Sequence, residues 1–251
     1  MLHVETTGSG PPVMLLHSSG MSSRQFAKLV PVLVARGYRV VAIDLIGHGK
    51  SAPLAEGAAM SWRDDVAEVA ALIDEPAYLV GHSYGGLVAL HVALAARVKG
   101  LVLYDPVAFG ILDERDRDAM ATLAQIDLNG GATLATRDEW LRSFVDYWGG
   151  PGAWQALREP ARAEFHRVGW AVREGVRTLM TDATKAAAYA ALPPLALITG
   201  EHTPVAARRV IDRLAAATQA SVTIIAGAGH MGPLSHADQV NARIAELLAT
   251  L

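Results

Sequence analysis

The stretch GHSYGG at residues 81–86 decides the fold of this chain, because it stands between an apolar run that ends at Val80 and an apolar, helix-forming stretch. A serine on a sharp turn between a buried strand and a helix has a strained backbone, which projects its hydroxyl from the carboxyl edge of the sheet. The neighbours Gly81 and Gly85 leave room for such a turn. The following helix directs its dipole and free amides at the serine, where they favour an oxyanion. We therefore predict that Ser83 is a nucleophile.

Short apolar runs bounded by turn residues recur along the chain and are typical of buried parallel strands. They cover residues 13–16, 40–43, 78–80, 101–104, 195–199 and 222–225. Alanine-rich amphipathic stretches, which we expect to be helices, lie between them at residues 25–35, 62–73, 87–96, 206–216 and 237–248. This alternation predicts an α/β fold with a doubly wound, mostly parallel sheet and helices on both of its faces.

The alternation stops once, because residues 106–194 contain no convincing strand. This segment holds four of the five tryptophans, charged helical stretches such as 113–124, and glycine and proline breakers at 149–152. We interpret it as a helical insertion between two late strands. The predicted organisation is a core of residues 1–105 and 195–251 with a helical cap of residues 106–194.

The composition argues against several classes of partner. The 251 residues are 51% hydrophobic and carry a net charge of −3, so no basic surface for nucleic acid or an anionic membrane is expected. No run of about 18 apolar residues is present that could span a membrane. With no cysteine, disulfides, thiolate metal sites and a cysteine nucleophile are excluded.

Location and cofactors are inferred by default. The amino terminus lacks the basic start and apolar stretch of a secretory signal, so we expect a cytoplasmic location. No metal or organic cofactor is implied, because no ligand cluster or dinucleotide glycine fingerprint accompanies a strand. The sequence leaves the oligomeric state open.

Four segments together resemble the α/β-hydrolase superfamily, and the resemblance covers nearly the whole chain. They read HSSG at 17–20, DLIGHGKS at 44–51, GHSYGG at 81–86 and GAGHM at 227–231. Their order and spacing are similar to those of the family, and the serine in the third segment is similar to its esterase-like branch. The resemblance implies an α/β-hydrolase fold with a catalytic triad. It also implies that Asp44 belongs to a structural loop beside the site.

By this resemblance His230, in the glycine-rich loop after the last predicted strand, is the general base. A serine hydroxyl is a poor nucleophile until an imidazole removes its proton, and imidazole titrates near neutrality. The resemblance also implies an oxyanion hole of two backbone amides, those of Tyr84 after the nucleophile and of Ser19 after the first core strand. The other histidines of the motif segments are expected to be structural: His17, His48 and His82.

The acid of the triad cannot be assigned to the position that is usual in the family. The family commonly carries an aspartate in a Gly-x-x-Asp loop after the penultimate strand, where this chain has Thr203, which cannot hold a negative charge against an imidazolium. Some members take the acid from another strand, and Asp105 follows the run 101–104 at the carboxyl edge, where α/β sheets gather their sites. We predict that Asp105 is the acid, with Glu201 as the alternative. Asp105 could also be a turn or capping residue before Pro106.

These residues predict a serine hydrolase that cleaves a small to medium apolar carboxylic ester, lactone or thioester through an acyl-enzyme. The aromatic residues of 106–194 indicate an apolar pocket for this small molecule, or else form the core of the insertion. Carbon–carbon bond hydrolysis, cofactor-free perhydrolysis and acyl transfer use the same triad and stay open. A non-catalytic ligand receptor is the alternative of another class, because a fold does not determine a function.

Overall fold

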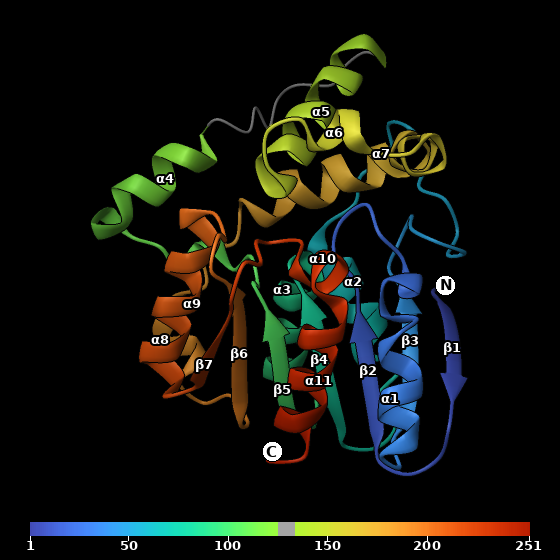
Figure 1. The fold of residues 1–251 in the computed structure, drawn as a ribbon, viewed down its shortest axis with the longest axis vertical. Coiled ribbons are helices and arrows are strands. Elements are labelled where there is room, and N and C mark those ends of the chain that lie inside the picture. Colours follow the sequence, from blue (N-terminus) through green and yellow to red (C-terminus); the bar gives the residue numbers. More distant parts are fainter. Residues whose placement is uncertain (125–133) are drawn as a thin grey trace.

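The computed structural model describes residues 1–124 and 134–251. At its centre is a seven-stranded sheet with the strand order β1-β3-β2-β4-β5-β6-β7 (Figure 1). Neighbouring strands are parallel except for β1, which pairs antiparallel to β3. The strands are β1 His3–Thr7, β2 Pro12–Leu16, β3 Arg39–Asp44, β4 Ala77–His82, β5 Val98–Tyr104, β6 Leu195–Gly200 and β7 Ser221–Ile225.

All six apolar runs form strands, as the sequence predicts, but the sequence pattern did not indicate β1. Its sequence HVETT has no apolar run, and its residues are half-buried or exposed. Backbone pairing with β3, from His3 opposite Asp44 to Thr7 opposite Val40, fixes this edge strand in place of side-chain burial. The predicted doubly wound, mostly parallel sheet is confirmed, with one antiparallel edge strand added.

Helices cover both faces of the sheet. On one face lie α1 Leu29–Ala35 and α11 Ala237–Leu248, and on the other lie α2 Trp62–Ala70, α3 Tyr84–Ala95 and α9 Val205–Thr218 (Figure 1). Two separate hydrophobic cores correspond to the two faces. The core under α1 and α11 includes Phe26, Leu29, Leu33, Val240 and Ile244. The core on the other face includes Val69, Leu87, Val88, Val210 and Leu214.

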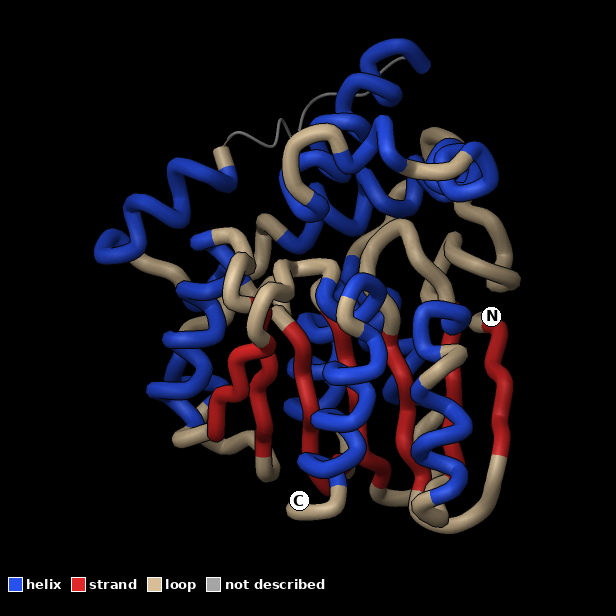
Figure 2. The backbone as a smooth tube through the Cα atoms, in the orientation of Figure 1, coloured by secondary structure: helices blue, strands red, loops and turns tan. Residues whose placement is uncertain are grey.

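The chain between β5 and β6, residues 106–194, is here called the insertion, and its described residues contain helices but no strand. Figures 1 and 2 show α5, α6 and α7 over the carboxyl ends of the strands, and α4 over the end of α9. The assignment of a cap domain with the boundaries 106–194 stays a prediction, and residues 125–133 lie outside the described part. The helices of the insertion are η2 Phe109–Ile111, η3 Glu114–Asp116, α4 Arg117–Leu123, α5 Leu134–Gly149, α6 Ala153–Ala156, α7 Glu159–Leu179 and α8 Ala186–Tyr189.

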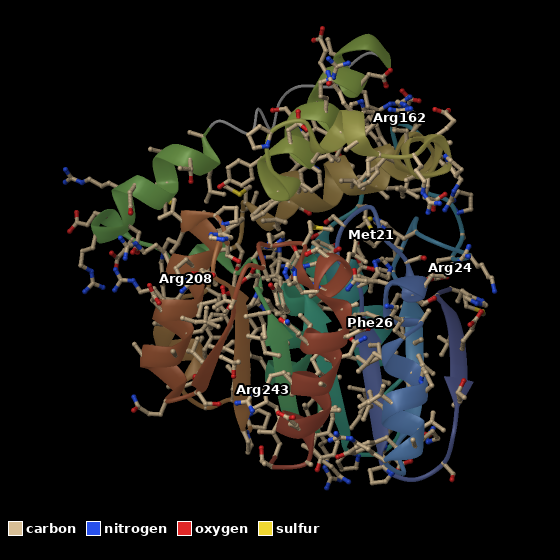
Figure 3. The ribbon with its side chains drawn as sticks, in the orientation of Figure 1. Met21, Arg24, Phe26, Arg162, Arg208 and Arg243 are labelled. Carbon is tan, nitrogen blue, oxygen red and sulfur yellow. The ribbon has the colours of Figure 1, made fainter. Side chains whose placement is uncertain are left out.

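The fold places several loops at one edge of the sheet. Because β2 to β7 are parallel, the loops that follow them meet at their carboxyl ends, which face the insertion. Two short helices, η1 Ser23–Phe26 and α10 Gly232–Ser235, also begin there. Figure 3 shows Met21 at this edge beneath α7, whereas Arg243 of α11 lies toward the opposite end of the sheet. Within residues 1–124 and 134–251, no helix is both long and apolar enough to cross a membrane.

Candidate active site

Ser83 occupies the turn between β4 and α3 and has a backbone conformation that side chains rarely adopt, with φ 55° and ψ −116°. Close contacts explain the small residues around it. A Cβ on Gly81 would lie 2.6 Å from the carbonyl oxygen of Gly85, and one on Gly85 would lie 2.2 Å from that of Leu16. The Ser83 amide donates to the Tyr104 carbonyl at 3.0 Å. The turn is thus held from two sides, and its strain fits a functional position.

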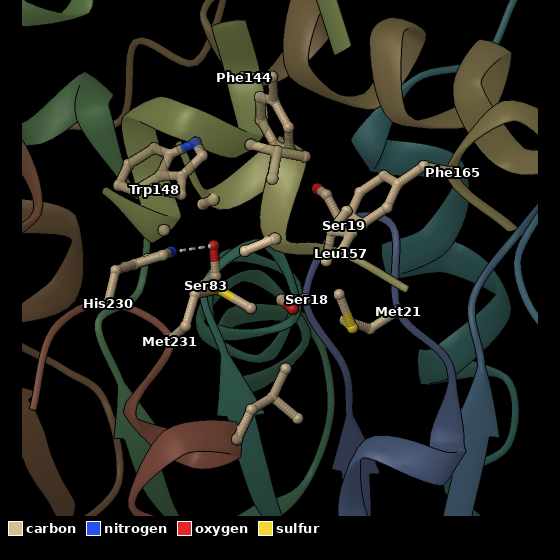
Figure 4. Close-up of a pocket in the computed structure, with 15 residues that line it drawn as sticks. Ser18, Ser19, Met21, Ser83, Phe144, Trp148, Leu157, Phe165, His230 and Met231 are labelled. Atoms are coloured by element: carbon tan, nitrogen blue, oxygen red, sulfur yellow. Dashed lines mark hydrogen bonds between the residues drawn. The ribbon is translucent and has the colours of Figure 1, made fainter. Parts of the chain in front are cut away.

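His230 follows β7 and places its imidazole against Ser83. The distance from His230 Nε2 to Ser83 Oγ is 2.9 Å (Figure 4). The loop that carries it is fixed by two buried side chains of the sheet. His82 Nε2 donates to the His230 carbonyl at 2.9 Å, and the Tyr104 hydroxyl donates to the Gly229 carbonyl at 2.7 Å. His82 therefore orients the loop, as expected for a structural histidine.

Asp105 stands directly after β5, fully buried and with a positive φ of 44°. Its Oδ2 lies 3.2 Å from His230 Nδ1. A carboxylate only accepts, so Nδ1 carries the proton, and Nε2 is left to accept the Ser83 hydroxyl proton. Thr203 Oγ1 donates to the same Oδ2 at 2.7 Å.

Glu201, the alternative acid, lies outside this cluster. Its side chain is 55% exposed, and its Oε2 accepts from the Gly227 amide at 2.8 Å. The structure therefore brings Asp105, and not Glu201, to within hydrogen-bonding distance of His230. Three loops that are far apart in the sequence supply Ser83, His230 and Asp105.

The two amides expected in an oxyanion hole belong to segments on either side of the nucleophile. Tyr84 begins α3 directly after Ser83, so its amide lies in the first turn of that helix. Ser19 lies in the loop after β2 and lines the same cavities as Ser83. An acyl group on Ser83 would lie next to both segments.

Two buried histidines hold the Ser19 loop in place. His17 donates from Nδ1 to the Ser18 carbonyl at 2.8 Å, and its Nε2 accepts from the Leu45 amide at 3.0 Å. His48 Nε2 accepts from the Gly20 amide at 3.1 Å. Burial lowers the pKa of His17 to about 3, so it stays neutral and can accept. These contacts tie the HSSG segment to the DLIGHGKS segment and support the structural roles expected for both histidines.

Asp44 of the DLIGHGKS segment also has a structural environment. Its Oδ1 accepts from the Ser23 amide at 2.7 Å, and its Oδ2 accepts from the Lys50 amide at 2.8 Å. Gly49 approaches so closely that a Cβ there would lie 2.3 Å from the carboxyl carbon of Asp44. The side chain therefore joins its own loop to the start of η1.

Asp65 of α2 is a buried acid that the sequence interpretation missed. Its Oδ2 accepts from the Tyr84 hydroxyl at 2.7 Å, and its Oδ1 accepts from the Ile46 amide at 2.9 Å. Burial raises its pKa to about 7, although both hydrogen bonds oppose the shift. A signal was present, because Asp65 lies three residues after Trp62 and four before Val69, on the apolar face of the predicted helix. Asp65 links α2, the loop after β3 and the residue next to the nucleophile.

Ser83 opens into two cavities of unequal size. The larger has a volume of about 360 Å³ and the smaller about 20 Å³, which is room for about one water-sized group. Ser19, Ser83, Phe144 and Trp148 line both. Among the described lining residues, none is Asp, Glu, Lys or Arg. The rest of the larger cavity is formed by Ser18, Met21, Val145, Gly149, Ala153, Ala156, Leu157, Phe165, His230, Met231 and Leu234.

Trp148 of α5, in the insertion, contacts the proposed base. Its ring centroid lies 4.1 Å from that of His230, and on another side it stacks with Phe109 at 6.4 Å. Figure 4 shows Trp148 above His230, and Phe165 and Leu157 on the opposite side of Ser83. The sequence indicated aromatic residues in this segment but not which of them reaches the site.

A metal centre finds no support in the described part of the chain, where no group of three or more His, Cys, Asp or Glu residues is arranged to hold an ion. The polar side chains that line the cavities are serines and His230, together with Trp148, whose indole carries one N–H. This set suits proton transfer and nucleophilic attack on a carbonyl.

Comparison with known proteins identifies the family. Residues 13–243 match the model of the "Alpha/beta hydrolase family". Over 272 aligned residues the chain is 30% identical to the pimeloyl-[acyl-carrier protein] methyl ester esterase of Xanthomonas axonopodis pv. citri, with 100% of both chains covered.

Solved structures share the fold. A hydrolase from Pseudomonas aeruginosa PA01 has a TM-score of 0.75 at 21% identity, over 98% of this chain and 94% of that one. A thermophilic esterase from Thermogutta terrifontis has a TM-score of 0.71 at 20% identity, over 99% of this chain and 93% of that one. The chain therefore belongs to the α/β-hydrolase family, and it is a hydrolase.

Proposed function

We propose that the protein is a serine hydrolase that cleaves small to medium apolar carboxylic esters, lactones or thioesters. Ser83 is the nucleophile, His230 the general base and Asp105 the acid that orients it. One observation carries the proposal: Ser83 Oγ, His230 and Asp105 form a continuous hydrogen-bonded chain, with distances of 2.9 and 3.2 Å, at the wall of an uncharged cavity.

Acylation follows from this geometry. Ser83 Oγ attacks the carbonyl carbon while its proton passes to His230 Nε2, and the carbonyl oxygen becomes an oxyanion. The amides of Ser19 and Tyr84 donate to that oxyanion, and the dipole of α3 adds to their effect. Asp105 stabilises the imidazolium through Nδ1. When the tetrahedral intermediate collapses, His230 protonates the leaving alcohol or thiol.

Deacylation repeats these steps with water. A water molecule takes the place of the leaving group, His230 accepts its proton, and the resulting attack releases the acid and regenerates Ser83. The apolar walls of the cavity around Ser83 limit competing polar contacts, which strengthens the interactions of the charges that develop there.

The shape of the site supports a substrate with two unequal parts. The uncharged cavity of about 360 Å³ suits an apolar group of several carbons, and the cavity of about 20 Å³ suits a group as small as a methyl. The Xanthomonas relative is a methyl ester esterase by name, so methyl esters of medium-chain acids are the first substrates to test.

The test is intact-mass labelling with a fluorophosphonate probe, which reports an activated serine without a known substrate. The protein should take up one probe rapidly, and Ser83→Ala should take up none. Ser235→Ala is the matched control, because Ser235 is an exposed serine of α10 near the same loop, and this variant should label at the unmodified rate. Folded protein that resists the probe, or a Ser83→Ala variant that still labels, would contradict the assignment. Resistance in a folded protein would favour a non-catalytic receptor.

A further inference from the structure

Thr203 contacts the proposed acid although it is not part of the hydrogen-bonded chain to Ser83. Its hydroxyl donates to Asp105 Oδ2 at 2.7 Å, and its oxygen accepts from the Gly200 amide at 3.1 Å. The Asp105 carboxylate can only accept a hydrogen bond, and the Gly200 amide can only donate one. The direction of both hydrogen bonds is therefore fixed, with the threonine proton directed at Asp105.

The Asp105 carboxylate has few other partners. Within the described residues, its side chain is fully buried and its Oδ1 has no hydrogen bond. Oδ2 alone receives both Thr203 and His230. Asp44 differs, because each of its two oxygens accepts from a backbone amide. Without Thr203, the orientation of Asp105 would depend on the same imidazole that it has to orient.

The loop that carries Thr203 is itself rigidly attached. The amides of Glu201 and His202 donate to the carbonyls of Ile225 and Ala228, at 3.0 and 2.8 Å. Arg208 Nη2 donates to the Gly200 carbonyl at 2.5 Å, and Figure 3 shows Arg208 on α9 toward the insertion side. The threonine hydroxyl is thus a fixed donor, which the backbone of two neighbouring loops holds in place.

We propose that Thr203 is a positioning residue whose hydroxyl locks the Asp105 carboxylate against His230. This inference rests on the proposed function, because it assigns Thr203 to the support of that triad. Charge-assisted hydrogen bonds are stronger than neutral ones, so the loss of this one should slow acylation of Ser83 measurably.

The experiment compares the phosphonylation rate constants of Thr203→Val and Thr203→Ser. Valine keeps the shape and removes the hydroxyl, and it should slow labelling about tenfold. Serine keeps the hydroxyl and should restore the rate to within about twofold. Thr223→Val is the matched control: Thr223 lies on the neighbouring strand β7, where its hydroxyl accepts from Arg243 Nε at 2.9 Å. It should label like the unmodified protein.

A double-mutant cycle separates positioning from a purely structural role in the turn. In an Asp105→Asn background, Thr203→Val should cost less than about twofold, because the group through which it acts is gone. An equal cost in both backgrounds, or a serine variant as slow as the valine variant, would overturn the proposal. Thermal unfolding confirms that each variant is folded. If the unmodified protein itself fails to label, the proposed function fails instead, and the two failures are distinguishable.

Discussion

The insertion and the rest of the chain line the same two cavities but contribute different chemistry to them. The serine and histidine side chains at the cavity walls, Ser18, Ser19, Ser83 and His230, all lie outside the insertion. The described lining residues of the insertion are apolar, alanine or glycine, with Phe144 and Trp148 shared by both cavities. We therefore expect variants outside the insertion to change the rate with every ester and variants of the insertion to change mainly the preference among esters, with Trp148, which packs on His230, as an exception.

The largest loss of activity is expected from a variant of the proposed acid, which lies outside the insertion. Asp105→Asn should lower kcat/KM by about 10³- to 10⁴-fold, because the amide favours the wrong imidazole tautomer and cannot stabilise an imidazolium. Glu201→Gln should change it by less than about twofold, as expected for a surface position. Steady-state kinetics with a methyl or p-nitrophenyl ester check both. A large loss in Glu201→Gln with an active Asp105→Asn would reverse the assignment of the acid.

The second-largest loss of activity is expected from a variant of the insertion, and it should depend on the length of the ester. Leu157 lines only the larger of the two cavities, so Leu157→Trp should fill part of it. We expect kcat/KM for p-nitrophenyl decanoate to fall about 10- to 100-fold, while the acetate ester, which needs little of that space, changes less than about threefold. An equal loss with both esters would mean that the insertion takes part in the chemistry itself.

Asp65, a buried acid outside the proposed triad, should control stability rather than rate. The folded-state pKa of Asp65, about 7, lies above its usual 3.8. The folded state therefore holds the proton more tightly, and the resulting stability is present below about pH 4 and is lost as the pH rises through about 7. Asp65→Asn should remove up to about 1.4 kcal/mol per pH unit of this slope. Chemical denaturation between pH 4 and 8 measures it.

The control for Asp65 is Glu68→Gln, which changes an exposed carboxylate on the same helix. This variant should keep the pH dependence of the unmodified protein. If Asp65→Asn keeps it too, the carboxyl group of Asp65 does not titrate in this range, and the slope has another source.

The smallest effect should come from Trp148, an insertion side chain that contacts the proposed base. Trp148 packs on His230, with ring centroids 4.1 Å apart. Aromatic contacts of this kind contribute about 0.5–1.5 kcal/mol, so Trp148→Ala should reduce kcat about fivefold with both short and long esters, and Trp148→Phe should recover most of it. A loss confined to long esters would place Trp148 with Leu157, as a residue of cavity shape only.

Much of the fold follows from hydrophobic pattern alone. The six apolar runs are strands because they are buried on both faces of a parallel sheet, which leaves a continuous signal in the sequence. β1 left no such signal, since it is an edge strand whose residues are half-buried or exposed. The same reasoning explains α10, which has four residues and begins with Gly232 and Pro233, too short for a periodic pattern.

Part of the candidate site could likewise be predicted from the sequence, and part of it could not. Sequence order predicted Ser83 and His230 as site residues and weighed Asp105 against Glu201, but only tertiary structure shows which acid lies near the imidazole. The contact of Thr203 with Asp105 joins residues 98 positions apart. The contact of Trp148 with His230 depends on how the insertion packs on the sheet. Pairings over such distances are set by the packing of whole elements, which a local pattern does not encode.

The contact between Thr203 and Asp105 has a consequence for how such a site can change over evolutionary time. The two side chains touch at 2.7 Å, and Thr203 occupies the loop position at which the resemblance places an acid. A negative charge at position 203 would therefore stand next to Asp105, at the end of the neighbouring strand. If carboxyl groups stood at both positions, the pair would hold one proton between them, because two negative charges at that distance repel each other. The threonine hydroxyl avoids this repulsion and donates a hydrogen bond to Asp105 instead.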